Sequence, residues 1–238
     1  MKDILIDDDI VEYDQVGDGQ QVIFLGGFCF PPSVYNIAEV PGFRITMPFI
    51  SGAPYREHPP ISLEDNVRLL TDFCHHKNIV PDYLIGHSWG ASIALEYASL
   101  HGAKKVYAAN PSIPVSHKTV RHCLRYIIES LSDITHPDTI TATRSLLAHN
   151  LKKPLVAAEQ IKAINDIRYS GSKGLKGYIA CSQTDKVYTK EDYQAFFNDT
   201  PFPSMYHIFY PYQGHNWIMH DTDAVKEGIY RLIERCDA

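Results

Sequence analysis

The chain of 238 residues contains 45% hydrophobic and 21% charged residues and has a formal net charge of −6. This apolar content excludes a disordered chain, and scattered Gly and Pro without a heptad pattern exclude collagen-like and coiled-coil proteins. The negative charge argues against a general nucleic-acid-binding protein, whose affinity depends on excess Lys and Arg.

The first 110 residues alternate short apolar strands with helices. Residues 10–16 and 21–25 predict a β-hairpin whose turn is Gly17-Asp18-Gly19, and further strands are predicted at 44–47, 83–85 and 105–109. Ser62 with Asp65 at N3 predicts a capped helix, and residues 89–100 predict a second one. The apolar positions shared by one face of the first helix are Leu63, Val67, Leu70 and Cys74.

The pattern changes between about Ile113 and Lys176, where no strand is predicted. Apolar residues recur there at helical spacing, namely Val120, Leu124, Ile127 and Leu131, and then Val156, Ala157, Ile161 and Ile164. Strands at 178–181 and 205–210, a helix at 189–198 and a last helix with Val225, Ile229, Leu232 and Ile233 inward follow. Continuous apolar strands alternating with helices predict an α/β domain with a parallel sheet covered on both faces. We expect one domain, with a core at 1–112 and 177–238 and a helical insertion at 113–176.

The strongest chemical signal is Gly86-His87-Ser88-Trp89-Gly90, which fits G-x-S-x-G between a predicted strand and a predicted helix. The tight turn forces Ser88 into a strained backbone conformation, and side chains at Gly86 and Gly90 are expected to collide with neighbouring backbone. Ser88 then stands at the positive end of a helix dipole, which favours developing negative charge. The motif predicts a nucleophilic serine.

A serine hydroxyl needs a general base and an acid that orients the base. Asp185 lies just past the strand at 178–181, and His215 lies in the loop after the strand at 205–210. In strand-turn-helix hydrolases the chain order is Ser, then Asp or Glu, then His, and catalytic groups gather at the carboxyl edge of the sheet. We therefore expect Ser88, Asp185 and His215 to converge. The expected oxyanion donors are the backbone N–H groups of Trp89 and Phe28, the latter in the Gly26-Gly27-Phe28 bend.

With these motifs, the chain resembles the α/β-hydrolase superfamily over nearly its whole length, the matches being 22–28, 44–54, 86–90, Asp185 and His215. The resemblance implies a mostly parallel sheet with helices on both faces and a helical cap at 113–176. Two positions depart from the usual pattern: Gly26 replaces a histidine of the oxyanion bend, and Phe49 stands where an acid is common. A serine nucleophile separates the chain from the epoxide hydrolase and haloalkane dehalogenase branches.

The remaining signals concern ligands and location. No metal-ligand spacing and no nucleotide-binding motif appears, so we expect neither a metal site nor a cofactor. No stretch reaches the roughly 20 apolar residues of a membrane span. The acidic start is unlike a signal peptide, and five widely spaced cysteines indicate reduced thiols, with Cys29 as a small packed residue. These features predict a cytoplasmic protein.

Charge is unevenly distributed. The insertion has ten Lys/Arg and five Asp/Glu residues, which gives it a net charge of +5 and leaves −11 for the rest of the chain. Either the sign is accidental, or a basic cap, with Arg121 and Arg125 among its cations, steers an anionic substrate or acidic partner such as acyl carrier protein.

The resemblance implies a serine hydrolase that cleaves a carboxylic ester or thioester of an acyl chain. In size, cap and triad the chain is similar to the esterases that act on the pimeloyl-carrier-protein methyl ester in biotin synthesis. Three alternatives use the same scaffold: a carbon–carbon bond hydrolase or lyase, an aminopeptidase with Glu129 or Glu159 holding the substrate amine, and a non-enzymatic ligand receptor.

Overall fold

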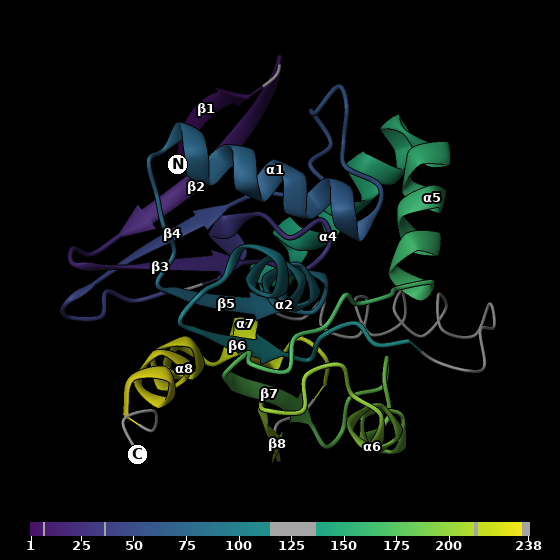
Figure 1. Ribbon diagram of the computed structural model, residues 1–238. Helices are drawn as coiled ribbons and strands as arrows, with labels where there is room; N and C mark the ends of the chain where they lie inside the picture. The colour runs from purple at the N-terminus through teal and green to yellow at the C-terminus, as the bar shows by residue number, and fades with distance from the viewer. Residues whose placement is uncertain (7, 36, 115–136, 212–213, 235–238) are drawn as a thin grey trace.

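The computed structural model describes residues 1–238 except 7, 36, 115–136, 212–213 and 235–238 (Figure 1). Its central element is an eight-stranded sheet in the order β1-β2-β4-β3-β5-β6-β7-β8. The pairs β1–β2 and β2–β4 are antiparallel, and every later pair is parallel. The strands are β1 (Lys2–Ile6), β2 (Asp9–Val16), β3 (Gln20–Leu25), β4 (Phe43–Pro48), β5 (Tyr83–His87), β6 (Lys105–Ala109), β7 (Gly177–Ser182) and β8 (Tyr206–Tyr210).

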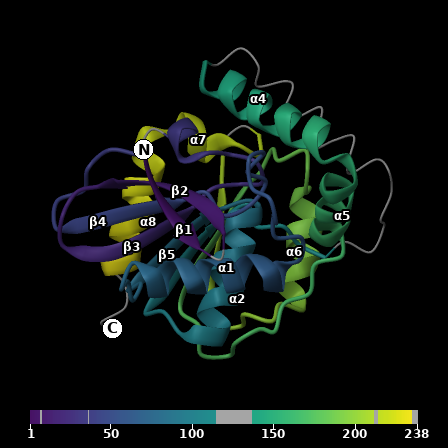
Figure 2. The ribbon, with the colours of Figure 1, turned by 90° about the horizontal axis from the view of Figure 1, so that it is seen from above.

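Helices cover both faces of this sheet (Figures 1 and 2). They are η1 (Pro32–Val34), α1 (Leu63–His76), α2 (Trp89–His101), α4 (Pro137–Lys152), α5 (Pro154–Asn165), α6 (Lys190–Asn198), α7 (Trp217–His220) and α8 (Thr222–Glu234). Buried residues of α1, α2 and α6 form one core layer, and those of α7 and α8 form the other. The predicted α/β architecture is confirmed.

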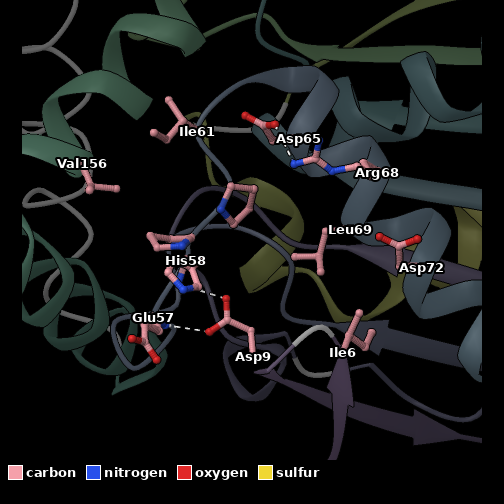
Figure 3. Close-up of a pocket in the computed structure, with 12 residues that line it drawn as sticks. Ile6, Asp9, Glu57, His58, Ile61, Asp65, Arg68, Leu69, Asp72 and Val156 are labelled. Atoms are coloured by element: carbon pink, nitrogen blue, oxygen red, sulfur yellow. Dashed lines mark hydrogen bonds and ion pairs between the residues drawn. The ribbon is translucent and has the colours of Figure 1, made fainter.

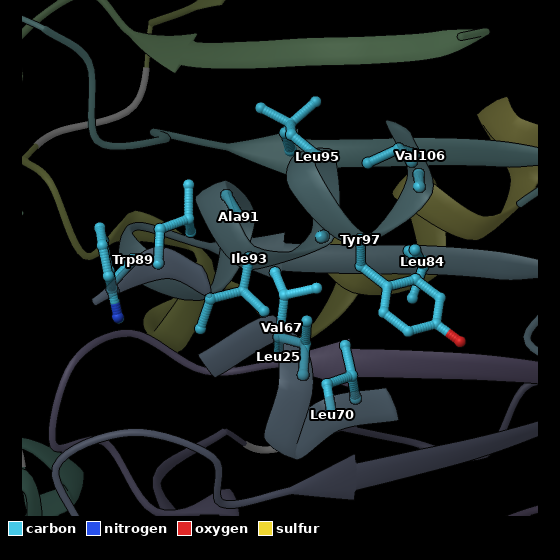
Figure 4. Close-up of a cluster of buried hydrophobic side chains, with 14 of the residues drawn as sticks. Leu25, Val67, Leu70, Leu84, Trp89, Ala91, Ile93, Leu95, Tyr97 and Val106 are labelled. Carbon is cyan, nitrogen blue, oxygen red and sulfur yellow. The ribbon is translucent and has the colours of Figure 1, made fainter. Parts of the chain in front are cut away.

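The two core layers are separated by the alternation of side chains along each strand. In β3, Ile23 and Leu25 pack against the α1 and α2 side, whereas Val22 and Phe24 pack against the α8 side. Figure 4 shows Leu25 among side chains of α1 and α2 in the first layer. Because both faces of the sheet are covered at its centre, β5, β6 and β7 are buried along nearly their whole length, as expected for parallel strands.

The first helix begins as predicted. The Ser62 hydroxyl accepts a hydrogen bond from the Asp65 N–H at 3.0 Å, and the Asp65 carboxylate accepts from the Ser62 N–H at 3.0 Å. This reciprocal capping box satisfies two donors at the start of α1. The buried face of α1 includes Leu63, Val67, Leu70 and Cys74.

The predicted hairpin between residues 10–16 and 21–25 is wrong, because β4 lies between β2 and β3 in the sheet. Gly17 and Gly19 have positive φ angles of 75° and 117°. A Cβ at Gly17 would lie 2.3 Å from the Phe43 carbonyl oxygen, and one at Gly19 would lie 2.1 Å from that of Gly42. The glycines therefore let the β2–β3 loop cross the start of β4. Strand β2 lies between β4 and β1 and pairs with both in antiparallel fashion; β1 was not predicted from the sequence.

The described part of the insertion contains α4 and α5 and no strand. The predicted helical positions Val120, Leu124, Ile127 and Leu131 lie outside the described residues. Beyond α5 the chain returns to the core, where Ile167 and Leu175 are buried in the α2 layer. There the Ser170 N–H donates to the Glu96 carboxylate at 3.0 Å, which ties this segment to α2.

Candidate active site

Ser88 stands in the turn that joins β5 to α2. Its φ and ψ angles are 53° and −121°, a conformation that a non-glycine residue rarely adopts. The Ser88 N–H donates to the Ala109 carbonyl of β6 at 2.9 Å, which holds the turn at the carboxyl edge of the sheet. A Cβ at Gly86 would lie 2.4 Å from the Ala91 Cα, so glycine is required there by close approach of backbone.

Three distant segments meet beside this serine. The His215 Nε2 atom lies 2.8 Å from the Ser88 Oγ atom, and the His215 Nδ1 atom lies 2.7 Å from an Asp185 carboxylate oxygen. All three side chains are buried. Asp185 follows β7 and His215 follows β8, so the parallel order of β5 to β8 brings them to one edge of the sheet.

Asp185 is held as an acceptor on both of its oxygens. Its Oδ1 atom accepts from the backbone N–H groups of Val187 at 2.7 Å and Tyr188 at 3.1 Å. Its Oδ2 atom, which faces His215, also lies 3.3 Å from the Tyr193 hydroxyl. Burial raises the pKa of Tyr193 well above its usual value, so this hydroxyl stays protonated, and its proton is within reach of both the Asp185 carboxylate and the Pro111 carbonyl, each 3.3 Å away. With His215 Nδ1 fixed as a donor to Asp185, Nε2 is left to accept the Ser88 proton.

The predicted oxyanion bend, Gly26-Gly27-Phe28, lies against the start of α2. A Cβ at Gly90 would lie 2.3 Å from the Gly26 carbonyl oxygen, so the absence of a side chain at Gly90 permits this contact. Trp89 follows the serine directly as the first residue of α2, and its side chain and that of Phe28 are buried. The structure thus brings the bend that contains Phe28 against the helix that begins with Trp89.

Tyr35 packs directly against Gly26 of the bend. A Cβ at Gly26 would lie 2.8 Å from the Tyr35 ring, and the Gly27 N–H donates to the Tyr35 hydroxyl at 2.7 Å. This residue was missed from the sequence, as were His87, Asn110 and Tyr193, because nothing in their local spacing marks them as neighbours of the triad.

Cys29 and the loop after β4 pack against each other beside the bend. The Cys29 N–H donates to the Ser51 carbonyl at 3.3 Å, and a Cβ at Gly52 would lie 2.3 Å from the Cys29 sulfur. Burial raises the pKa of the Cys29 thiol, which disfavours the reactive thiolate. These contacts fit the expected role of Cys29 as a small packed residue.

Helix α4 of the insertion contacts the oxyanion bend. The His149 ring packs edge-on against the Phe28 ring with centroids 5.8 Å apart, and its Nε2 atom lies 2.6 Å from the Gln160 side-chain oxygen of α5. Arg121, Arg125 and Glu129, which sequence reasoning singled out, lie outside the described residues, and Glu159 is exposed on α5.

A separate cavity of about 450 Å³ lies between α1, the loop at 57–61 and the ends of β1 and β2 (Figure 3). No triad residue lines it, and its buried carboxylate, Asp9, accepts from the backbone N–H groups of Glu57 and His58 at 2.7 and 3.0 Å. Across the described residues there is no group of three or more His, Cys, Asp or Glu side chains that could hold a metal ion. In the same part of the chain, no helix is long and apolar enough to cross a bilayer.

No protein-family profile and no curated protein sequence matches the chain, but many solved structures do. A thermophilic esterase from Thermogutta terrifontis is 17% identical, with a TM-score of 0.68 over 94% of this chain and 94% of that one. A putative lipase from Acinetobacter baumannii AYE is 15% identical, with a TM-score of 0.75 over 96% and 89%. The thioesterase domain from the curacin biosynthetic pathway is 16% identical, with a TM-score of 0.65 over 96% and 98%. At such identities the likeness concerns the fold alone, and with the strand order above it shows that this chain has the α/β-hydrolase fold.

Proposed function

We propose that the chain is a serine hydrolase that cleaves a carboxylic ester or thioester of an acyl substrate. The observation that carries this proposal is the unbroken chain of short contacts from Ser88 Oγ through His215 to Asp185, 2.8 and 2.7 Å long. An ordinary buried serine needs one hydrogen-bond partner and no strained backbone. The positive φ of Ser88, at the start of a helix and at the carboxyl edge of the sheet, supports a reactive role.

In the proposed first half-reaction, Ser88 Oγ attacks the substrate carbonyl while its proton passes to His215 Nε2. Asp185 stabilises the resulting imidazolium and stays ionised. The carbonyl π electrons move onto oxygen, and the backbone N–H groups of Phe28 and Trp89 donate to that oxyanion. When the tetrahedral intermediate collapses, the bond to the alkoxide or thiolate breaks, and His215 returns the proton to this leaving group.

In the second half-reaction, water replaces the leaving group. His215 Nε2 removes a proton from the water as its oxygen attacks the Ser88 acyl ester, through a second oxyanion held by the same two amides. Collapse of this intermediate releases the carboxylic acid, and His215 returns the proton to Ser88 Oγ. The cycle consumes one water and leaves the side chains unchanged.

The catalytic proposal is tested with Ser88→Ala, measured with p-nitrophenyl esters and with a fluorophosphonate probe. We expect the wild-type protein to hydrolyse the esters and to be labelled at one site, and the variant to lose both properties. Labelling that persists in the variant at wild-type level contradicts the assignment of Ser88. Ser99→Ala is the matched control, since Ser99 lies towards the far end of α2 from Ser88 and its hydroxyl donates to the Leu95 carbonyl of the same helix.

A carrier-linked acyl group is the substrate that the charge distribution favours, as in an esterase acting on a pimeloyl carrier-protein methyl ester. The support is the net charge of +5 on the insertion, since acyl carrier proteins are acidic and would be attracted to it. Charge reversal at Arg121 and Arg125 is then expected to lower kcat/KM for a carrier-linked ester far more than for a neutral p-nitrophenyl ester. Equal effects on the two substrates contradict the carrier proposal and leave the hydrolase proposal intact.

A further inference from the structure

A buried row of hydrogen bonds connects the oxyanion bend to the residue that carries the catalytic imidazole. The Gly27 N–H donates to the Tyr35 hydroxyl at 2.7 Å, and this hydroxyl lies 2.8 Å from the His87 Nδ1 atom. On the other side of the same ring, His87 Nε2 lies 3.1 Å from the His215 carbonyl oxygen. Tyr35, His87 and His215 are all buried.

The direction of every bond in this row follows from its two ends. A backbone N–H can only donate and a carbonyl can only accept. Because the His215 carbonyl accepts, the His87 Nε2 that faces it donates, and in the neutral imidazole Nδ1 is then the unprotonated nitrogen that accepts the Tyr35 proton. His87 therefore carries its proton on Nε2 and donates to the His215 carbonyl. Burial raises the pKa of Tyr35, so the phenol keeps the proton that this order needs.

We propose that Tyr35 and His87 are positioning residues that hold the oxyanion bend and the His215 backbone in one fixed relation. This inference rests on the proposed hydrolase function. Gly27 directly precedes Phe28, so the bond to Tyr35 fixes the peptide that leads to one oxyanion donor. His215 carries the general base, so the bond from His87 fixes the backbone from which that base projects.

The surroundings of the row favour a rigid arrangement. Tyr35 is the residue that fills the space beside Gly26, and its ring also packs edge-on against Phe24 with centroids 4.8 Å apart. The Phe30 ring stacks on His87 with centroids 6.1 Å apart. Hydrogen bonds enclosed by aromatic rings are strengthened by the low local dielectric. Asn110 also donates to the His215 carbonyl, at 2.7 Å, so two donors converge on this oxygen.

The proposed role explains how the chain works without the usual histidine of the oxyanion bend. In this chain the anchor comes from Tyr35, which follows η1, and from His87, the variable residue of the G-x-S-x-G motif. The anchor therefore joins the bend directly to the turn that presents Ser88.

Tyr35→Phe tests the proposal, because it removes one oxygen and keeps the buried ring. The matched control is Tyr178→Phe, since Tyr178 is also buried and its hydroxyl has no hydrogen-bond partner among the residues that the structure describes. We expect Tyr35→Phe to lower kcat for a p-nitrophenyl ester about 10- to 100-fold with KM within about twofold, as loss of transition-state positioning requires. Affinity for a trifluoromethyl ketone, which forms a tetrahedral adduct, is expected to fall by a similar factor. We expect Tyr178→Phe to leave both values at the wild-type level.

Two outcomes overturn the proposal. One is wild-type kcat in Tyr35→Phe, and the other is a loss of kcat that the Tyr178→Phe control reproduces. An independent readout is the ¹⁵N spectrum of the wild-type imidazoles, in which His87 is expected as the Nε2–H tautomer. An Nδ1–H tautomer contradicts the proposed order of bonds even if activity changes. Absence of esterase activity and fluorophosphonate labelling in the wild-type protein is a different result, which refutes the hydrolase function itself.

Discussion

Replacing Asp185 by asparagine changes which nitrogen of His215 carries the proton. The Asp185 Oδ1 atom accepts two backbone N–H groups, so the single amide oxygen of the variant takes that position. The new NH₂ group then faces His215 Nδ1, 2.7 Å away in the wild-type structure. Because an NH₂ group donates, it binds the unprotonated form of Nδ1, and the imidazole proton moves to Nε2. That nitrogen faces Ser88 Oγ and can no longer accept its proton.

The expected loss is large, because the base is present but in the wrong tautomer. In Ser-His-Asp enzymes such a change lowers kcat by about four orders of magnitude, which corresponds to about 5.5 kcal/mol of barrier. The assay is kcat for a p-nitrophenyl ester, with thermal unfolding measured alongside. Asp18→Asn is the control, since Asp18 is an exposed residue of the β2–β3 loop. Activity of Asp185→Asn within about tenfold of wild type refutes the reasoning.

Three further predictions concern backbone contact, pH and stability. Gly90→Ala places a Cβ 2.3 Å from the Gly26 carbonyl oxygen, so we expect it to lower the free energy of unfolding in urea by about 1–3 kcal/mol and to lower kcat. The control is Gly174→Ala, whose Cβ meets nothing within 4 Å, and equal stability of the two variants contradicts the prediction. Burial lowers the pKa of His149, so below about pH 6.5 the unfolded chain binds more protons than the folded one, and this residue's contribution to stability is lost as the pH falls. Between pH 7.5 and 5 we therefore expect His149→Gln to lose less free energy of unfolding than the wild-type protein. An equal loss in the two proteins contradicts this. Ser62→Ala removes the cap of α1 and is expected to cost about 1 kcal/mol in urea unfolding, and an unchanged midpoint is the contrary result.

Local signals predicted the elements around the triad well. The strand at 105–109 is confirmed at its bounds, and the strands at 83–85 and 178–181 are confirmed with two more residues each. These strands are continuous apolar runs between clear helix signals, so periodicity alone identifies them. The chain order of the motif, the acid and the histidine was likewise readable, because a parallel sheet brings the ends of its strands to one edge.

Non-local contacts explain what the sequence did not reveal. Gly17-Asp18-Gly19 has the composition of a hairpin turn, but its glycines are needed because the loop lies against the backbone of Gly42 and Phe43, where a side chain would collide. Similarly, Tyr35 meets His87 across 52 residues of sequence, and no spacing rule relates the two. The replacement of a histidine by Gly26 marked the oxyanion bend as unusual. That Tyr35 packs against Gly26 could be seen only in the folded structure.

The proposed mechanism requires that Ser88 Oγ becomes acylated during turnover. The most direct test mixes the protein with a p-nitrophenyl ester, quenches it in acid within the first turnover and locates the acyl group by mass spectrometry of the peptides. We expect a burst of nitrophenol of up to one per chain and an acyl mass on Ser88 in the wild-type protein, with neither in His215→Ala. Steady hydrolysis with the acyl group on another residue, or with the same burst in His215→Ala, contradicts the mechanism.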